Sequence, residues 1–219
     1  MRLSHLRALN NSAIMAHIDS TIRHLKDGSE VTLRTGVEED APSLLATLSN
    51  YISENEGMVW EPDEYRKSEQ EIGERIRTMR ENPKEILILA TSNNEIIGNI
   101  DFHVGARKRI AHVGELGMGM LPAFRSRGLG SLLLDRLIRW AKQVPELEKI
   151  NLNVISTNER AIGLYRKFGF EEEGRRLREF KYSNGSYADA VLMGKIIRPA
   201  SVHFGSGTQF ETTRPELGK

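Results

Sequence analysis

Residues 122–131 read PAFRSRGLGS, and this stretch is the most informative part of the sequence. It joins a strand to an amphipathic helix expected over residues 130–143. Gly128 and Gly130 have no side chain to keep a ligand away from the backbone. The N–H groups of the loop lie where the helix begins, and free donors at the positive end of a helix dipole favour a bound pyrophosphate. The stretch therefore predicts a phosphate-binding loop between a strand and a helix.

Two arginines strengthen the phosphate-binding interpretation. Arg125 and Arg127 can make charge-assisted contacts with phosphate oxygens. Other nucleotide-binding motifs fail, because no Lys follows Gly130 as a P-loop requires, and residues 117–122 (GMGMLP) depart from the G-x-G-x-x-G fingerprint. The alternative interpretation is a glycine-containing turn that only caps a helix.

Outward from this loop, short apolar runs bounded by turn residues predict strands, and runs of helical periodicity predict helices. Several strands come first along the chain and then alternate with helices. That order predicts an α/β (α+β) domain with a mixed, mostly antiparallel sheet and helices on both faces. Strands are expected at 31–34, 86–90, 96–104, 110–120, 150–155, 170–173, 178–182 and 187–196, and helices at 38–52, around 72–79, at 130–143 and at 159–168.

One domain with two extensions accounts for the length of the chain. Residues 1–29 carry apolar residues at about helical spacing, which predicts a helical extension that docks on the domain or on a second copy of the chain in a homodimer. A partly ordered leader is the alternative. The domain proper covers residues 30–198, and residues 199–219 form a polar tail. The periodic residues of the extension are Leu6, Leu9, Ile14, Ile18, Ile22 and Leu25.

Composition and charge exclude several classes of function. Hydrophobic residues make up 39% of the 219-residue chain, which is enough for a core, and a formal net charge of +1 gives no overall field for attracting nucleic acid or anionic lipid. The chain has no cysteine, which excludes disulfides, thiolate nucleophiles and sulfur-ligated zinc. No stretch approaches the roughly 20 apolar residues that cross a bilayer, and no signal peptide is recognisable. We expect a cytoplasmic protein with no metal ion, membrane or nucleic-acid partner.

A second motif follows the strand expected at 150–155. Residues 156–170 read STNERAIGLYRKFGF. The pattern R-x-x-G-x-G, followed at this distance by N-x-x-A-x-x-L-Y-x-K-x-G-F, resembles the GNAT superfamily of N-acetyltransferases over about residues 30–198. Residues 173–193 are similar to the branch that contains spermidine and ribosomal-protein acetyltransferases. The resemblance implies a GNAT-like sheet and an enzyme that moves an acetyl group from acetyl-CoA to a primary amine.

The resemblance also implies where acetyl-CoA binds. In the family the cofactor lies in a cleft where two neighbouring parallel strands splay apart, and these would be strands 110–120 and 150–155. The backbone of residues 118–120 would pair with the pantetheine arm, and the phosphate-binding loop would hold the pyrophosphate. Asn158 would bond the pantetheine end and could also cap a helix. The residues expected at the cofactor are Met118, Gly119, Met120, Arg125, Ser126, Arg127, Gly128, Leu129, Gly130, Ser131 and Asn158.

Tyr165 matches the family tyrosine that protonates the departing thiolate. An amine that attacks a thioester forms a tetrahedral intermediate, and its collapse expels a sulfur anion that a nearby phenol can protonate. No covalent enzyme intermediate is needed, in agreement with the absence of cysteine. The alternative role of Tyr165 is a core aromatic beside Leu164, Phe168 and Phe170.

The general base is harder to assign. Some relatives carry a glutamate on the strand that ends in the second motif, and that position holds Asn153, which cannot serve as a base. Glu115 on the neighbouring strand is the replacement that we expect, and His112 is the second candidate. For both residues, the alternative is an ordinary position on the surface of the sheet.

Family substrates contact the loop after the first helix, and that loop is acidic here. Glu54, Glu56 and Trp60 are the expected acceptor-binding residues, because carboxylates beside an aromatic ring attract a cationic amine. A solvated acidic loop is the alternative. The acceptor is a small-molecule or peptide amine, and a polyamine, an amino acid, a peptide N-terminus and an aminoglycoside all remain open.

Two other functions compete with acetyl transfer. A catalytically degenerate acyl-CoA-binding regulatory protein would keep the loop without the chemistry, but the sequence retains Tyr165 and a candidate base. A nucleic-acid-binding module could use basic residues near the C-terminal hairpin, but the net charge and the absence of a helix-turn-helix pattern oppose it. These basic residues are Arg175, Arg176, Arg178 and Lys181.

Overall fold

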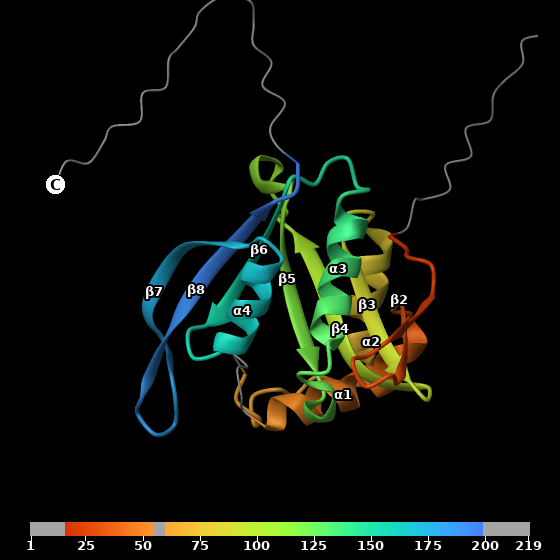
Figure 1. The fold of residues 1–219 in the computed structure, drawn as a ribbon, viewed down its shortest axis with the longest axis horizontal. Helices are drawn as coiled ribbons and strands as arrows, with labels where there is room; N and C mark the ends of the chain where they lie inside the picture. The colour runs from red at the N-terminus through yellow and green to blue at the C-terminus, as the bar shows by residue number, and fades with distance from the viewer. Residues whose placement is uncertain (1–15, 55–59, 199–219) are drawn as a thin grey trace, which may run out of the picture.

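An eight-stranded sheet runs through the protein, and helices cover both of its faces (Figure 1). The computed structural model describes residues 16–54 and 60–198. The strands are β1 (Thr21–His24), β2 (Glu30–Thr35), β3 (Ile86–Ser92), β4 (Glu95–Val104), β5 (Val113–Met120), β6 (Lys149–Ile155), β7 (Glu171–Lys181) and β8 (Tyr187–Ile196), and the α-helices are α1 (Ala41–Ser53), α2 (Glu69–Glu81), α3 (Leu129–Ala141) and α4 (Glu159–Lys167).

The strands lie in the order β1-β2-β3-β4-β5-β6-β8-β7 across the sheet. Every neighbouring pair is antiparallel except β5 and β6, which run parallel. The predicted mixed, mostly antiparallel sheet with helices on both faces is therefore confirmed.

Two hydrophobic layers hold the helices on the sheet. On one face, α3 and α4 bury residues such as Leu133 and Ile162. On the other face, α1 and α2 bury residues such as Leu44. Strand β3 contributes to both layers, since Ile88 belongs to the first and Leu89 to the second. Burial on both faces explains why β3 is a continuous apolar run and not an alternating one.

Local sequence signals fix where the helices begin. Ser68 caps α2, because its Oγ accepts the N–H of Glu71 (3.2 Å) while the Glu71 carboxylate accepts the N–H of Ser68 (2.8 Å). Asn158 caps α4, with its Oδ1 accepting the N–H of Ala161 (3.1 Å). Helix α3 begins after Gly128, which has a φ of 98° in the left-handed region. The two motifs of the sequence are thus the starts of α3 and α4.

The described end of the N-terminal extension corrects a prediction. Strand β1 pairs antiparallel with β2, so the helix expected over residues 1–29 is wrong for this part, and residues 1–15 lie outside the described residues. Ile22, one of the periodic apolar positions, is 59% exposed, whereas Ile18 and Leu25 are buried. The edge of β2 offers unpaired backbone groups, and pairing with them outweighs a short helical periodicity.

The C-terminal hairpin also differs from the prediction. Strand β7 is continuous, where two short strands were expected. The register of β7 on β8 shifts between Arg176 and Phe180, so the predicted interruption is an irregularity inside one strand. Strand β5 begins three residues later than expected, because Lys108–Ile110 forms a 3-10 turn. The tail expected at 199–219 lies outside the described residues.

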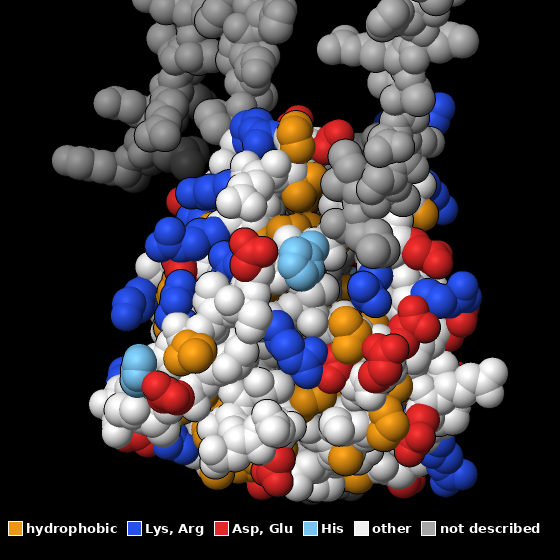
Figure 2. Space-filling view, turned by 90° about the vertical axis from the view of Figure 1, so that its right-hand side faces the viewer, with side chains coloured by type: hydrophobic (Ala, Val, Ile, Leu, Met, Phe, Trp, Pro, Cys, Tyr) orange, Lys and Arg blue, Asp and Glu red, His pale blue; other side chains and the backbone are white. Residues whose placement is uncertain are grey.

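The surface carries charges of both signs. Figure 2 views the molecule from the side on which β2 lies in Figure 1, and Lys and Arg occur there together with Asp and Glu. This mixture agrees with the net charge of +1. Within the described residues, no helix is both long and apolar enough to span a membrane.

Candidate active site

The two parallel strands β5 and β6 separate and leave a cleft between them. Their pairing covers only residues 113–115 with residues 149–151. Beyond these residues, β5 stays paired with β4 up to Met120, and β6 stays paired with β8 up to Ile155. The cleft has a volume of about 400 Å³. The splayed parallel pair that the resemblance implied is therefore present.

Most residues that the sequence assigned to the cofactor line this cleft. They come from β5, from the phosphate-binding loop and from the start of α4. The lining includes Met118, Gly119, Met120, Arg125, Ser126, Gly128, Gly130, Ser131 and Asn158. Two assigned residues, Arg127 and Leu129, are not among those that line it, and the Leu129 side chain belongs to the core beneath α3.

The phosphate-binding loop presents backbone donors to the cleft. Among the described residues, no acceptor is found for the N–H groups of residues 126–130. The N–H of Ser131 is already bonded to the carbonyl oxygen of Gly128 (3.1 Å), so it is not one of the free donors that the sequence suggested. Gly130 keeps the cleft open, since a Cβ there would lie 3.1 Å from Leu164 Cδ2 and 3.2 Å from Met120 Cε. An anion fits such a donor array at the start of α3.

The Arg127 side chain does not occupy the position expected for a phosphate contact. Its guanidinium forms an ion pair with Asp27 and donates to Ser29 Oγ (2.9 Å), and it stacks over the Phe124 ring at 4.9 Å from the centroid. These partners lie on the N-terminal segment and in the loop itself. The expected phosphate contact of the Arg127 side chain is therefore replaced by a contact that ties the loop to the turn between β1 and β2.

Two other cations line the cleft beside Arg125. Lys26 comes from the turn between β1 and β2, and its N–H donates to the carbonyl oxygen of Arg127 (2.9 Å). Arg160 comes from the first turn of α4 and donates to Ser126 Oγ (3.4 Å). The positive charge around the loop thus comes from three separate segments of the chain.

Tyr165 lies on the buried side of α4 and lines the same cleft. Its side chain is 6% exposed, and its ring packs edge-on against Phe170 with 5.8 Å between centroids. Burial raises the pKa of the Tyr165 phenol to about 12. The hydroxyl therefore keeps its proton at neutral pH, which a proton donor requires. The core-aromatic role and the cleft-lining role hold together for this residue.

Glu115 lies at the edge of the site. It is exposed on β5, and its Oε1 accepts a hydrogen bond of 2.6 Å from Asn153 Nδ2. Asn153 lines the cleft, whereas Glu115 and His112 are not among the lining residues. Glu115 therefore reaches the cleft only indirectly, through its hydrogen bond with Asn153.

A second cavity of about 240 Å³ lies between the sheet and helices α1 and α2. It shares residues 117–119, Tyr51 and Trp60 with the cleft, so the two spaces meet at the middle of β5. Arg75 and Asp101 are its only charged lining residues within the described parts of the chain. Its apolar walls include Leu44, Leu48, Ile52, Ile72, Ile76 and Met79.

Tyr51 forms the wall between the cleft and the second cavity. Its hydroxyl donates to Asn99 Oδ1 (3.0 Å), and burial raises the pKa of the phenol far above its usual value. Gly119 makes room for this ring, because a Cβ there would lie 2.4 Å from Tyr51 Cζ. The passage between the two spaces therefore depends on a glycine in the middle of β5.

The residues expected at the acceptor lie in different places in the structure. Trp60 lines both spaces and packs edge-on against Tyr65, with 5.8 Å between ring centroids. Glu54 forms an ion pair with Arg125 (3.2 Å) and so contacts the phosphate-binding loop. Glu56 lies outside the described residues.

Residues 46–170, which contain the phosphate-binding loop and the second motif, match the family described as Acetyltransferase (GNAT) family. The chain belongs to the GNAT acetyltransferase family. This acetyltransferase is 29% identical over 109 residues to the L-amino acid N-acetyltransferase of Escherichia coli (strain K12), covering 50% of the chain and 67% of that relative. It is 36% identical over 72 residues to spermidine N(1)-acetyltransferase of the same strain, and this match covers 33% of the chain and 38% of that relative. These names identify it as an N-acetyltransferase.

Solved structures agree with this assignment. The GNAT-family acetyltransferase of Streptococcus pneumoniae superposes with a TM-score of 0.74 at 30% identity, covering 76% of this acetyltransferase and 99% of that chain. The phosphinothricin acetyltransferase of Sinorhizobium meliloti, solved in complex with AcCoA, has a TM-score of 0.69 at 20% identity, covering 85% and 97%. The similarity to the S. meliloti structure shows that the two proteins share a fold.

Several residues at the site of this acetyltransferase escaped the sequence analysis. The sequence contained a signal for Arg160, because this residue lies two positions after Asn158 in the second motif, at the start of a helix. Lys26, Tyr51 and Asp101 had none, since each reaches the site from an element far from both motifs. Phe180 also lines the cleft and reaches it from β7.

Proposed function

We propose that this acetyltransferase binds acetyl-CoA in the cleft and transfers the acetyl group directly to a primary amine. One observation carries the proposal: Ser126, Gly128 and Gly130, whose N–H groups have no acceptor among the described residues, line the same cleft as the phenol of Tyr165. Acetyl-CoA in the complex of the S. meliloti neighbour supports the choice of acyl donor. The names of the relatives support an amine acceptor, which is an amino acid in one and spermidine in another.

The residues of the cleft fit the parts of acetyl-CoA. The donors of residues 126–130 suit the pyrophosphate, with Lys26, Arg125 and Arg160 as counter-charges. The edge of β5 that faces β6 is unpaired beyond Glu115, so its backbone can bond the amides of the pantetheine arm. Asn158 borders the cleft and also caps α4, so the cap leaves it in a position to contact the pantetheine end.

The chemistry then needs one proton donor and one proton acceptor. The amine nitrogen attacks the thioester carbon, the C–S bond breaks, and the thiolate takes a proton from Tyr165. The proton lost by the amine goes to Glu115 through a water molecule in the cleft beside Asn153. Afterwards Glu115 is protonated and Tyr165 is not, and exchange with solvent restores both groups for the next turnover.

Replacing Lys26 with alanine should raise the Kd of CoA about 3- to 10-fold, because one charge-assisted contact is lost. The backbone bond from residue 26 to Arg127 is kept in this variant. Isothermal titration calorimetry measures the effect, with Arg23→Ala as the control, since among the described residues the Arg23 side chain bonds only the carbonyl of Ile22. Equal affinities of wild type and Lys26→Ala would place Lys26 outside the cofactor site and return residues 1–29 to a packing role alone.

Replacing Glu115 with glutamine should lower kcat about 100-fold and remove the acidic limb of the pH–rate profile. Glutamine keeps the acceptor oxygen for Asn153 but cannot take a proton. The profile is measured with two amines of different basicity, because ionisation of the amine produces a similar limb. Glu95→Gln, at the far end of β4, is the control. Unchanged turnover and an unchanged profile would exclude Glu115 as the base.

The alternative functions have weaker support. A regulator without catalysis would not need a buried, protonated phenol in the cleft, and the relatives are named as enzymes. The basic residues considered for nucleic acid are engaged locally. Arg175 pairs with Glu172 (2.6 Å), Arg176 pairs with Glu179 (3.2 Å), and Arg178 stacks over Tyr187.

A further inference from the structure

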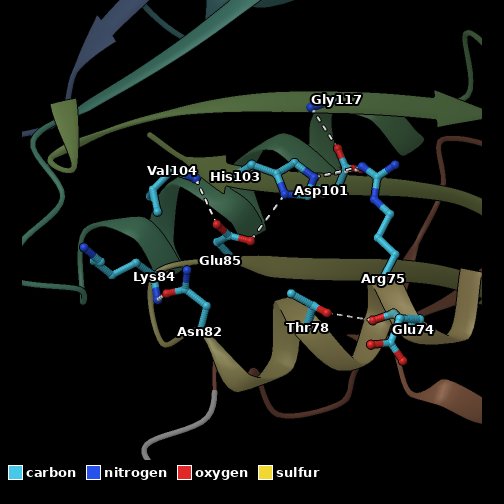
Figure 3. A network of polar contacts seen from close by, with 10 residues as sticks. All are labelled: Glu74, Arg75, Thr78, Asn82, Lys84, Glu85, Asp101, His103, Val104 and Gly117. Carbon is cyan, nitrogen blue, oxygen red and sulfur yellow. Dashed lines mark hydrogen bonds and ion pairs between the residues drawn. The ribbon is translucent and has the colours of Figure 1, made fainter. Parts of the chain in front are cut away.

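The second cavity holds one pair of opposite charges among apolar walls. Arg75 Nη2 lies 2.9 Å from Asp101 Oδ2, and the other carboxylate oxygen, Oδ1, accepts the N–H of Gly117 (3.0 Å). Figure 3 shows Arg75 reaching up from α2 to Asp101 on β4. Gly117 lines both spaces, so this pair sits where the cavity joins the cleft.

A network behind the pair fixes its orientation. Arg75 Nη2 also lies 2.8 Å from His103 Nε2, and His103 Nδ1 lies 3.4 Å from Glu85 Oε2 (Figure 3). The Asp101 carboxylate, whose Oδ2 lies 3.6 Å from His103 Nε2, raises the pKa of His103, and burial opposes the rise. His103 and Glu85 are not cavity-lining residues, so they act as positioning residues.

The guanidinium of Arg75 has donors left for a ligand. Its Nη2 donates to Asp101 and lies beside His103 Nε2, while no acceptor for its Nη1 or Nε is found within residues 16–54 and 60–198. The side chain is 55% exposed, compared with 18% for Asp101. A planar fork with free donors at the mouth of a cavity is suited to a carboxylate, which it can bind with two parallel hydrogen bonds.

We propose that the acceptor is an α-amino acid with an apolar side chain. Its carboxylate binds the free donors of Arg75, its amino group lies beside Asp101 and faces residues 117–119, and its side chain enters the apolar part of the cavity. A zwitterion carries a positive and a negative group on one carbon, which complements the charges of Arg75 and Asp101. The inference rests on the proposed acetyl transfer and names the substrate class of that same site.

The cavity opposes a polyamine. Its described lining carries one positive and one negative charge, so it offers no excess of carboxylates to a polycation. Each further ammonium group would have to enter apolar walls without a partner, which is unfavourable. Glu54, which the sequence offered for this purpose, already pairs with Arg125. The volume of about 240 Å³ lies below the range typical of drug-sized ligands, in agreement with a compact acceptor.

A panel of four acceptors tests the proposal: L-leucine, L-leucinamide, L-glutamate and spermidine. Release of CoA thiol from acetyl-CoA gives kcat/KM for each. L-Leucine should be the best acceptor, and L-leucinamide, which lacks only the carboxylate, should be about 10- to 100-fold poorer. L-Glutamate should also be poor, because its second carboxylate would enter apolar walls. If spermidine or L-leucinamide reacts as well as L-leucine, the inference is wrong, and the proposed acetyl transfer stands.

The variant Arg75→Gln assigns the effect to the residue. Glutamine keeps one donor for Asp101 but loses the charge and the fork, so kcat/KM for L-leucine should fall about 10- to 100-fold, mainly through KM. Activity with L-leucinamide should hardly change. Arg77→Gln on the same helix is the control, because Arg77 pairs with Glu74 and Glu81.

Two further measurements distinguish loss of the Arg75 contact from a folding defect and from failure of the proposed acetyl transfer. Arg75→Lys keeps the charge beside Asp101 without the fork and should have an intermediate KM for L-leucine. An unchanged Kd for acetyl-CoA shows that a variant is folded. An equal loss with L-leucine and L-leucinamide in a variant that binds acetyl-CoA normally would overturn the role of Arg75. Absence of turnover with every amine would overturn both proposals.

Discussion

Replacing Tyr165 with phenylalanine should lower kcat by about 100- to 10,000-fold, while the Kd of acetyl-CoA stays nearly unchanged. The variant removes one hydroxyl and keeps the ring, so the edge-on contact with Phe170 and the packing of α4 remain. The thiolate must then leave without a proton donor at the cleft. Single-turnover kinetics measure the chemical step, and calorimetry measures the binding of acetyl-CoA.

The pH dependence of the wild-type enzyme gives a second check on Tyr165. An unperturbed phenol would lose its proton around pH 10, whereas burial raises the pKa of this phenol to about 12. Because the raised pKa keeps the protonated form, the donor remains available up to that higher pH, and its loss should appear as a basic limb near the upper value. The Tyr165→Phe variant should show no such limb.

A tyrosine away from the cleft provides the control for this experiment. Tyr187 lies at the start of β8, is 43% exposed and stacks with Arg178. Tyr187→Phe removes the same hydroxyl without touching the cleft and should keep wild-type kcat. Full activity of Tyr165→Phe would remove the proton-donor role and leave Tyr165 as a core aromatic, although the proposed cofactor site would be unaffected.

Replacing Gly128 with valine should weaken CoA binding about 1,000-fold or more. Gly128 has a φ of 98°, which a β-branched residue adopts only with strain. The new side chain would also point toward Lys26, whose Cγ would lie 3.5 Å from the added Cβ. A shifted loop loses several charge-assisted bonds from the N–H groups of residues 126–130 at once, and these losses add up. Calorimetric titration with CoA measures the result.

Gly185 separates loss of the donors from general strain. It has a φ of 83° in the turn between β7 and β8, and a Cβ there would meet nothing within 4 Å. Gly185→Val therefore carries a similar backbone strain at a position outside the cleft lining, and it should bind CoA like the wild type. A folded Gly128→Val variant with wild-type affinity would show that the pyrophosphate does not bind at this loop.

The starts of α3 and α4 could be predicted because their signals are local. The left-handed glycine at 128 and the cap at Asn158 act on backbone groups only a few residues away, so contiguous sequence contains them. The apolar run of β3 similarly predicted a buried strand. These features, joined to the motif that contains Tyr165, were enough to predict the fold, the cleft between β5 and β6 and a tyrosine that lines it.

The helix expected over residues 1–29 shows where local signals fail. Its apolar residues have only about helical spacing, and the edge of β2 provides the described part with backbone partners that the sequence does not reveal. The pairing of β1 with β2 also determines the partners of Arg127. The turn between these strands carries Asp27 and Ser29, and both bind the Arg127 guanidinium although Ser29 is 98 positions away in the chain. Lys26 from the same turn lines the cleft, whereas Arg127 does not.

The family fold, the loop at residues 122–131 and the place of Tyr165 beside it could be predicted from the sequence, because periodicity, caps and glycine conformations depend on neighbouring residues. Tertiary contacts, in contrast, determine which side chains surround the cleft and the second cavity. Arg75 on α2 meets Asp101 on β4 beneath Gly117 on β5 because strand order and register bring three distant segments to one point. No local pattern encodes such a meeting, since it depends on how the helices and strands pack together.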